Sequence, residues 1–207
     1  MASPRIAALR EMALEHPAPA LASDEMRFLF ASGWQQHANE PVQLRRQTLA
    51  RANVLISMTP AIDGHELIVG RQNFDVKLTA EQADFLTLAG SLIPRAGGMD
   101  SHMALDYEKL ITGGTQGVRE EINKHMQGLD TLQNPKDIEK GVFYSNCLTM
   151  LDALERMAEN YAAHALSLAG QADGARQNEL LLIAENLHQV PGIPPKPSIR
   201  RCRPYRY

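Results

Sequence analysis

The chain has 207 residues, of which 44% are hydrophobic, and 21 Lys and Arg against 24 Asp and Glu give a formal net charge of −3 at pH 7. This length allows one domain with a sizeable core, whereas no apolar run approaches the roughly 20 residues that span a bilayer. Because the start lacks a charged-then-apolar leader and the two cysteines suit neither a disulfide framework nor a metal cluster, we expect a protein of the reducing cytoplasm.

Two helices are predicted in the first 40 residues. Pro4 to Glu15 form a short amphipathic pattern, and Ser23 can cap the next helix because its hydroxyl accepts from exposed amide groups. Asp24 and Glu25 favour the positive end of that second helix. The predicted inward residues of the first helix are Ile6, Leu9, Met12 and Ala13.

A longer amphipathic helix is predicted from Pro41 to Met58. The residue before a proline avoids the α region, so Thr59-Pro60 ends this helix. Asp63-Gly64 then predicts a turn, and Glu66–Gly70 predicts a brief buried strand or an extended segment. The apolar positions at helical spacing are Leu44, Leu49, Ala52, Val54, Leu55 and Met58.

The second half of the sequence is also helical in pattern. Thr79 to Gln82 have the form of a capping box and open a helix through Leu88. The Gly-Gly pairs at 97–98 and 113–114 predict loops, and a further helix is expected to begin around Thr115. Neither pair has the strand-to-helix context of a phosphate loop.

The longest helix is predicted to begin at Asn134–Asp137 and to run through Ala169, with proline in its tolerant first turn. A last periodic helix runs from Glu179 to Val190. The fold class is therefore mainly α. The predicted inward side chains of these two helices are Val142, Cys147, Met150, Leu151, Leu154, Met157, Tyr161, Leu166, Leu180, Leu181, Ile183, Ala184 and Leu187.

Three ordered blocks carry a family resemblance: D-G-H-E-L-I-V-G at 63–70, S-H-M-A-L-D-Y-E-K-L at 101–110 and R-Q-N-E-L-L-L-I-A-E at 176–185. They resemble the amino-terminal region of glycyl-radical enzymes, the family of pyruvate formate-lyase and its diol-dehydratase and lyase relatives. The order and approximate spacing match from about Ser23 to Pro191, although residues 71–98 match poorly. The resemblance implies the amino-terminal helical segment of a fold built on a 10-stranded β/α barrel, with the barrel core absent here.

The resemblance divides the chain at residue 191. Residues 1–191 are expected to form a partial pyruvate formate-lyase-like domain, and 192–207 an aberrant basic tail. Residues 193–207 hold five basic residues and no acid, and the core-facing pattern stops at Pro191. We chose codons that are permitted for residues 192–207 and added one T ahead of them. The shifted reading frame then translates to W-H-P-A-Q-T-F-Y-Q-A-L-Q-T-V, which resembles the way the family continues after this helix. A one-base loss is therefore preferred to a tail that tethers nucleic acid or membrane.

Substrate contact is implied for His102 and Asp106, because the histidine at the matching position lines the substrate pocket in diol-dehydrating members. A loop histidine is otherwise usually a local hydrogen-bonding residue.

Cys147 lies in the middle of the apolar stripe and is interpreted as a packed cysteine rather than the radical-carrying thiol, and Cys202 belongs to the tail. No catalytic, cofactor-binding or metal-binding residue is predicted. Glu121 and His125 share one helix face without making a metal site. The cluster Arg45, Arg46 and Arg51 could bind phosphate, but is expected to salt-bridge neighbouring helices.

The 207 residues contain neither the barrel-loop cysteine nor the R-V-x-G-Y-like glycine motif of the family. The resemblance therefore implies a truncated enzyme, formate acetyltransferase-like or dehydratase- or lyase-like, that is inactive alone. In the intact parent, an activating enzyme with an iron–sulfur cluster and S-adenosylmethionine would install the glycyl radical, and a homodimer is possible. The alternative is a self-standing helical interaction protein, or a subunit of a split enzyme, that pairs through Pro4–Glu15.

Overall fold

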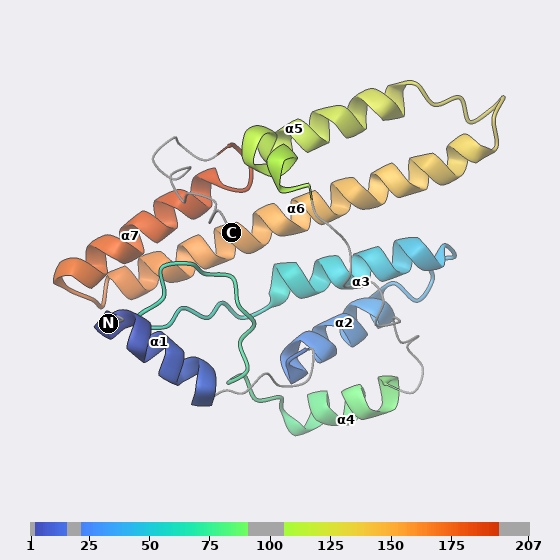
Figure 1. The fold of residues 1–207 in the computed structure, drawn as a ribbon. Coiled ribbons are helices and arrows are strands. Elements are labelled where there is room, and N and C mark those ends of the chain that lie inside the picture. The colour runs from blue at the N-terminus through green and yellow to red at the C-terminus, as the bar shows by residue number, and fades with distance from the viewer. Residues whose placement is uncertain (1–2, 16–21, 91–105, 195–207) are drawn as a thin grey trace.

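A computed structural model describes residues 3–15, 22–90 and 106–194. Within these ranges the chain forms helices and no strand, which confirms the mainly α prediction. Figure 1 shows their arrangement. The helices are α1 (Pro4–Glu15), α2 (Asp24–Gln36), α3 (Gln43–Ser57), α4 (Ala80–Ala89), α5 (Tyr107–Gln127), α6 (Lys136–Ala169) and α7 (Gly174–Gln189).

The long helix α6 is the centre of the packing. It contacts α7, α3 and α5, while α2 packs on the other side of α3 and α4 packs on α2 (Figure 1). The irregular segment that joins α3 to α4 runs back toward α6 and α7. The described helices therefore stack in the order α4, α2, α3 and α6, with α5 and α7 also packed on α6 and the long α3–α4 segment inserted among them.

Small side chains line the contact between α6 and α7. Ala162, Ala165 and Ala169 are buried on α6, and they pack with Leu180, Ile183 and Ala184 of α7. Alanines let two helix backbones approach closely, so burial here depends on shape more than on side-chain size. The predicted stripes are correct for Tyr161 and for the buried α7 residues, but wrong for Leu166 and Leu181, which are each 46% exposed.

Two helix starts follow the predicted chemistry. The Ser23 hydroxyl accepts a hydrogen bond from the Met26 amide at the start of α2. At α4, the Thr79 hydroxyl accepts from the Gln82 amide, and the Gln82 side chain accepts from the Thr79 amide. Both bonds of the predicted capping box are therefore present.

Three predictions in the amino-terminal half are wrong in part. In α1, Ile6 is 56% exposed and Ala13 is also exposed, although Leu9 and Met12 are half-buried. Leu44 on α3 is 52% exposed as well. Residues 66–70 form no strand, and Ile68 is 90% exposed, so the segment is not a buried strand. Its backbone is fixed instead by side chains of other elements.

The helix expected to begin near Thr115 starts earlier and contains a kink. α5 begins at Tyr107, and the Gly-Gly pair at 113–114 lies inside it rather than in a loop. Gly114 alone leaves helical geometry, with φ 63° and ψ −173°. α5 is therefore two half-helices joined at one glycine.

Candidate functional site

The first and third sequence blocks meet in space. From α7, the guanidinium of Arg176 donates to the backbone carbonyl oxygens of Asp63 and Glu66, at 2.6 and 2.8 Å. The Glu66 carboxylate is buried. It accepts from the Asp63 amide at 2.7 Å and from the side chain of Arg71 at 2.9 Å. The turn predicted at Asp63-Gly64 is present, and Arg176 holds it against α7.

Glu179 in the same third block joins a second contact. Its carboxylate accepts from Arg176 at 3.1 Å and forms a bidentate pair with Arg5 of α1, at 2.6 and 2.8 Å. Hydrogen bonds from Arg5 and then from Arg176 lower the pKa of Glu179. The R-x-x-E of the third block thus connects both α1 and the α3–α4 segment to α7.

Buried polar groups complete this region. Tyr161 of α6 is 1% exposed, and its hydroxyl donates to the Arg71 carbonyl oxygen at 2.6 Å. Burial raises the pKa of Tyr161, so it stays a neutral donor. One oxygen of buried Glu25 accepts from the Thr59 amide and hydroxyl, at 3.1 and 2.5 Å, while its other oxygen is buried and has no hydrogen-bond partner among the described residues. These contacts orient the α3–α4 segment, and the sequence analysis did not identify them. The Tyr161 contact had one signal in the sequence: a tyrosine among the alanines of α6 is expected to find a hydrogen-bond partner for its buried hydroxyl.

Of the two predicted substrate-contacting residues, His102 lies outside the described residues. Asp106 lies at the amino end of α5, where its side chain accepts from the Lys109 amide at 3.0 Å. It is exposed to solvent. The structure therefore gives Asp106 a capping role at the start of the kinked helix, next to the segment that carries His102 in the sequence.

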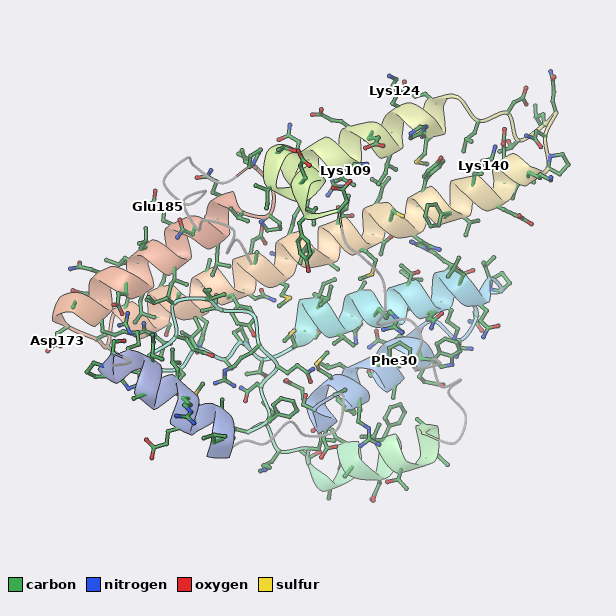
Figure 2. The ribbon with its side chains drawn as sticks, in the orientation of Figure 1. Phe30, Lys109, Lys124, Lys140, Asp173 and Glu185 are labelled. Carbon is green, nitrogen blue, oxygen red and sulfur yellow. The ribbon has the colours of Figure 1, made fainter. Side chains whose placement is uncertain are left out.

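An ion pair crosses the kink of α5. Lys109 precedes Gly114 and its ammonium lies 2.9 Å from the Glu121 carboxylate, which follows the kink; Lys109 is labelled in Figure 2. The hydrogen bond between them raises the pKa of Lys109 and lowers that of Glu121. Both groups are solvent-exposed, so this pair adds little stability. His125 lies 4.0 Å from the same carboxylate.

At the kink, α5 meets the chain that follows α7. The Thr115 amide donates to the Pro191 carbonyl oxygen at 2.8 Å, and the Gln116 amide donates to the Gly192 carbonyl oxygen at 3.2 Å. A Cβ atom on Gly114 would lie 2.6 Å from the Gly192 oxygen and 2.9 Å from the Pro191 oxygen. Gly114 also has a positive φ, so both its backbone angle and this close approach require glycine.

A buried hydrogen bond ties the same point to α6. Thr115 is 0% exposed, and its hydroxyl donates to the Glu155 carboxylate at 2.5 Å. Arg119 lies 3.1 Å from Glu155 and 2.7 Å from Asp152. Three elements therefore converge on Thr115: the kink of α5, the middle of α6 and the end of α7.

The remaining candidate side chains pack rather than form a reactive cluster. Cys147 is a half-buried free thiol on α6, and burial raises its pKa, which disfavours the thiolate. Among the residues that the structure describes, no three His, Cys, Asp or Glu side chains come together as a metal site requires. No described helix is both long and apolar enough to cross a bilayer.

The arginines of α3 contact neighbouring helices, but the predicted salt bridges are wrong: none of them pairs with an acid among the described residues. Arg45 donates to the Asn146 and Thr149 side chains of α6, at 3.2 and 2.6 Å. Arg46 lies 4.2 Å from the centre of the Trp34 ring, and Arg51 lies 5.7 Å from the ring of Phe30, which Figure 2 labels on α2. They join α3 to α2 and α6 through neutral partners.

One cavity of about 200 Å³ lies between the start of α2 and the segment that leads to α4. It is smaller than most small-molecule sites. Its lining residues are Ala22, Ser23, Asp24, Phe74, Val76, Lys77 and Leu78. Asp106 does not line this cavity.

Comparisons with known proteins show which family this chain resembles. Residues 93–198 match the family model described as pyruvate formate lyase-like. The isethionate sulfite-lyase of Desulfovibrio desulfuricans is 32% identical over 99 residues, which cover 47% of this chain and 12% of that enzyme. The indoleacetate decarboxylase of Tractidigestivibacter scatoligenes is 32% identical over 109 residues, covering 51% of this chain and 12% of that enzyme.

Solved structures show the same fold. The glycerol-bound B12-independent glycerol dehydratase of Clostridium butyricum has a TM-score of 0.77 at 19% identity, covering 94% of this chain and 32% of that one. A glycyl radical enzyme from Archaeoglobus fulgidus has a TM-score of 0.68 at 22% identity, covering 90% of this chain and 31% of that one. The chain thus spans less than a third of these structures and about an eighth of the curated relatives. It belongs to the pyruvate formate lyase-like family of glycyl-radical enzymes and covers a helical part of their fold.

Proposed function

We propose that this chain is the amino-terminal helical portion of a glycyl-radical lyase or dehydratase that acts on a small molecule. The observation that carries the proposal is the fold match over 94% of this chain to 32% of a glycerol dehydratase. The relatives reported above are named as a sulfite-lyase, a decarboxylase and a dehydratase, which favours a lyase or dehydratase over a formate acetyltransferase.

The described residues support a scaffolding role for this portion. Arg176, Glu66 and Tyr161 fix the α3–α4 segment, and Thr115 fixes the kinked α5. We place substrate contact on the segment that leads into α5, through His102 and Asp106. The support for Asp106 is its exposed position at the start of α5, where its own hydrogen bond to the Lys109 amide holds it.

The radical chemistry is assigned to the rest of the parent enzyme. A separate activating enzyme that uses S-adenosylmethionine would install a glycyl radical there, and the chain described here would hold none. We assign the parent to the cytoplasm, with a homodimer as a possible assembly. Residues 1–191 would be the partial enzyme domain and 192–207 a shifted reading frame, supported by the loss of the core-facing pattern after Pro191.

An anaerobic activation assay tests this proposal. The purified chain is incubated with an activating enzyme, S-adenosylmethionine and a reductant, together with isethionate, glycerol or 1,2-propanediol. We expect neither product nor a glycyl-type doublet in the electron paramagnetic resonance spectrum. A full-length isethionate sulfite-lyase with its own activating enzyme is the positive control. Product formation by this chain above the protein-free blank would refute its assignment as an inactive portion.

A further inference from the structure

The second half of α5 begins at Thr115, and the first amide groups of a helix have no partner within that helix. Here the acceptors come from a distant part of the chain. The Thr115 and Gln116 amides donate to the carbonyl oxygens of Pro191 and Gly192, at 2.8 and 3.2 Å. The residues after α7 therefore cap the middle of α5.

The same point is anchored to α6 from inside the fold. The Thr115 hydroxyl is fully buried and donates to Glu155 at 2.5 Å. Breaking this bond leaves the fully buried Thr115 hydroxyl without its charged acceptor, which costs more than losing an exposed hydrogen bond, whereas Glu155 is 34% exposed and keeps its pair with Arg119. We call this set (Gly114, Thr115, Gln116, Glu155 and 191–192) the Thr115 junction.

Two segments depend on the Thr115 junction. Residues 106–113 reach the fold through Gly114, whose positive φ sets their direction. Residues 190–194 lie against the same glycine, and the Ile193 amide closes their turn on the Gln189 carbonyl oxygen at 2.9 Å. Apart from the junction, a solvent-exposed ion pair joins residues 106–113 to the second half of α5.

We infer that the Thr115 junction is a conformational latch: it holds residues 106–113 and 190–194 in one fixed relation, and its opening releases both segments together. This coupling goes beyond the proposed function and does not require it. One consequence rests on the proposed function: if Asp106 contacts substrate, the latch sets the position of that contact relative to residues 190–194.

Hydrogen exchange measured by mass spectrometry on the full chain tests the latch. Thr115→Val keeps the shape and removes the hydroxyl, whereas Thr115→Ser keeps the hydroxyl. The matched control is Thr112→Val, because the Thr112 hydroxyl is exposed and donates to the Glu108 and Lys109 carbonyl oxygens one turn earlier. Thr115→Val should speed exchange about 10- to 100-fold in both 107–113 and 189–193.

The control and the rescue variant complete the test. Thr115→Ser should restore slow exchange in both segments, and Thr112→Val should leave 189–193 unchanged. α2 and α3 should keep their exchange rates in every variant. Faster exchange confined to α5 in Thr115→Val, or an equal increase across α2, α3 and α7, would overturn the latch.

A measurement on the unsubstituted chain covers the case in which Thr115→Val does not fold. At low denaturant, the Thr115, Gln116 and Ile193 amides should open with the same free energy and the same denaturant dependence, because one event exposes them. Separate dependences for the α5 amides and for Ile193 would refute a common opening.

Discussion

Replacing Arg176 by alanine tests whether the first and third sequence blocks form one structural unit. The guanidinium donates at 2.6 and 2.8 Å to two loop carbonyls, and its side chain is 22% exposed. A hydrogen bond that involves a charged group contributes about 1.5–3 kcal/mol, so with partial exposure we expect Arg176→Ala to cost roughly 2–4 kcal/mol. This is a large share of a typical stability of about 5–15 kcal/mol.

Urea unfolding followed by far-ultraviolet circular dichroism measures this cost. The midpoint should fall with little change in the denaturant dependence, and the melting temperature should drop by roughly 5–15 °C. Arg156→Ala is the matched control, because Arg156 is 61% exposed and its ion pair is with Glu159 one turn away. It should cost less than about 0.5 kcal/mol. If both variants lose the same stability, the contact between the blocks has no structural role.

Three further predictions use single side chains. Tyr161→Phe should cost about 1–3 kcal/mol in urea unfolding because a buried carbonyl loses its donor, whereas Tyr144→Phe should cost less; equal costs would contradict the buried bond. Arg5 lowers the pKa of Glu179 in the folded chain, so this ion pair stabilises the fold above the unfolded-state pKa of Glu179, and the stabilisation is lost as pH falls through the folded-state pKa. Glu179→Gln should therefore make the free energy of unfolding depend less on pH in the acid range. An unchanged pH profile would contradict this. Burial raises the pKa of Cys147, so a thiol reagent at mildly alkaline pH should modify Cys147 more slowly in the folded chain than in urea. Equal rates at Cys147 would show an accessible thiolate.

Local chemistry was the predictable part of this fold. The hydroxyl caps at Ser23 and Thr79 depend on neighbours within three residues, so sequence alone identified them. The long α6 was predictable for a related reason, because its periodic pattern runs uninterrupted over many turns. The family resemblance was also readable, since its blocks are short and ordered along the chain.

Contacts between distant residues were not predictable. Leu166 and Leu181 are apolar at helical spacing, yet alanines take the close contact between α6 and α7 and leave these leucines 46% exposed. The partner of Arg176 is a pair of loop carbonyls more than 100 positions away, which no pattern within α7 indicates. Thr115 likewise looks like an ordinary loop residue after two glycines until the end of α7 is placed against it.

Sequencing the gene from the codons of α7 through several hundred bases beyond residue 207 tests whether this chain is a portion of a longer glycyl-radical enzyme. The read must cover codons 192–198 without a gap, because the family match runs to residue 198 in the present frame whereas we place the shift near residue 192. We predict a reading frame, shifted by one base near Gly192, that encodes a β/α barrel, its loop cysteine and a carboxyl-terminal R-V-x-G-Y-like glycine motif. If no barrel-encoding frame follows within a base or two, the chain is not a portion of a radical lyase or dehydratase in the sense proposed.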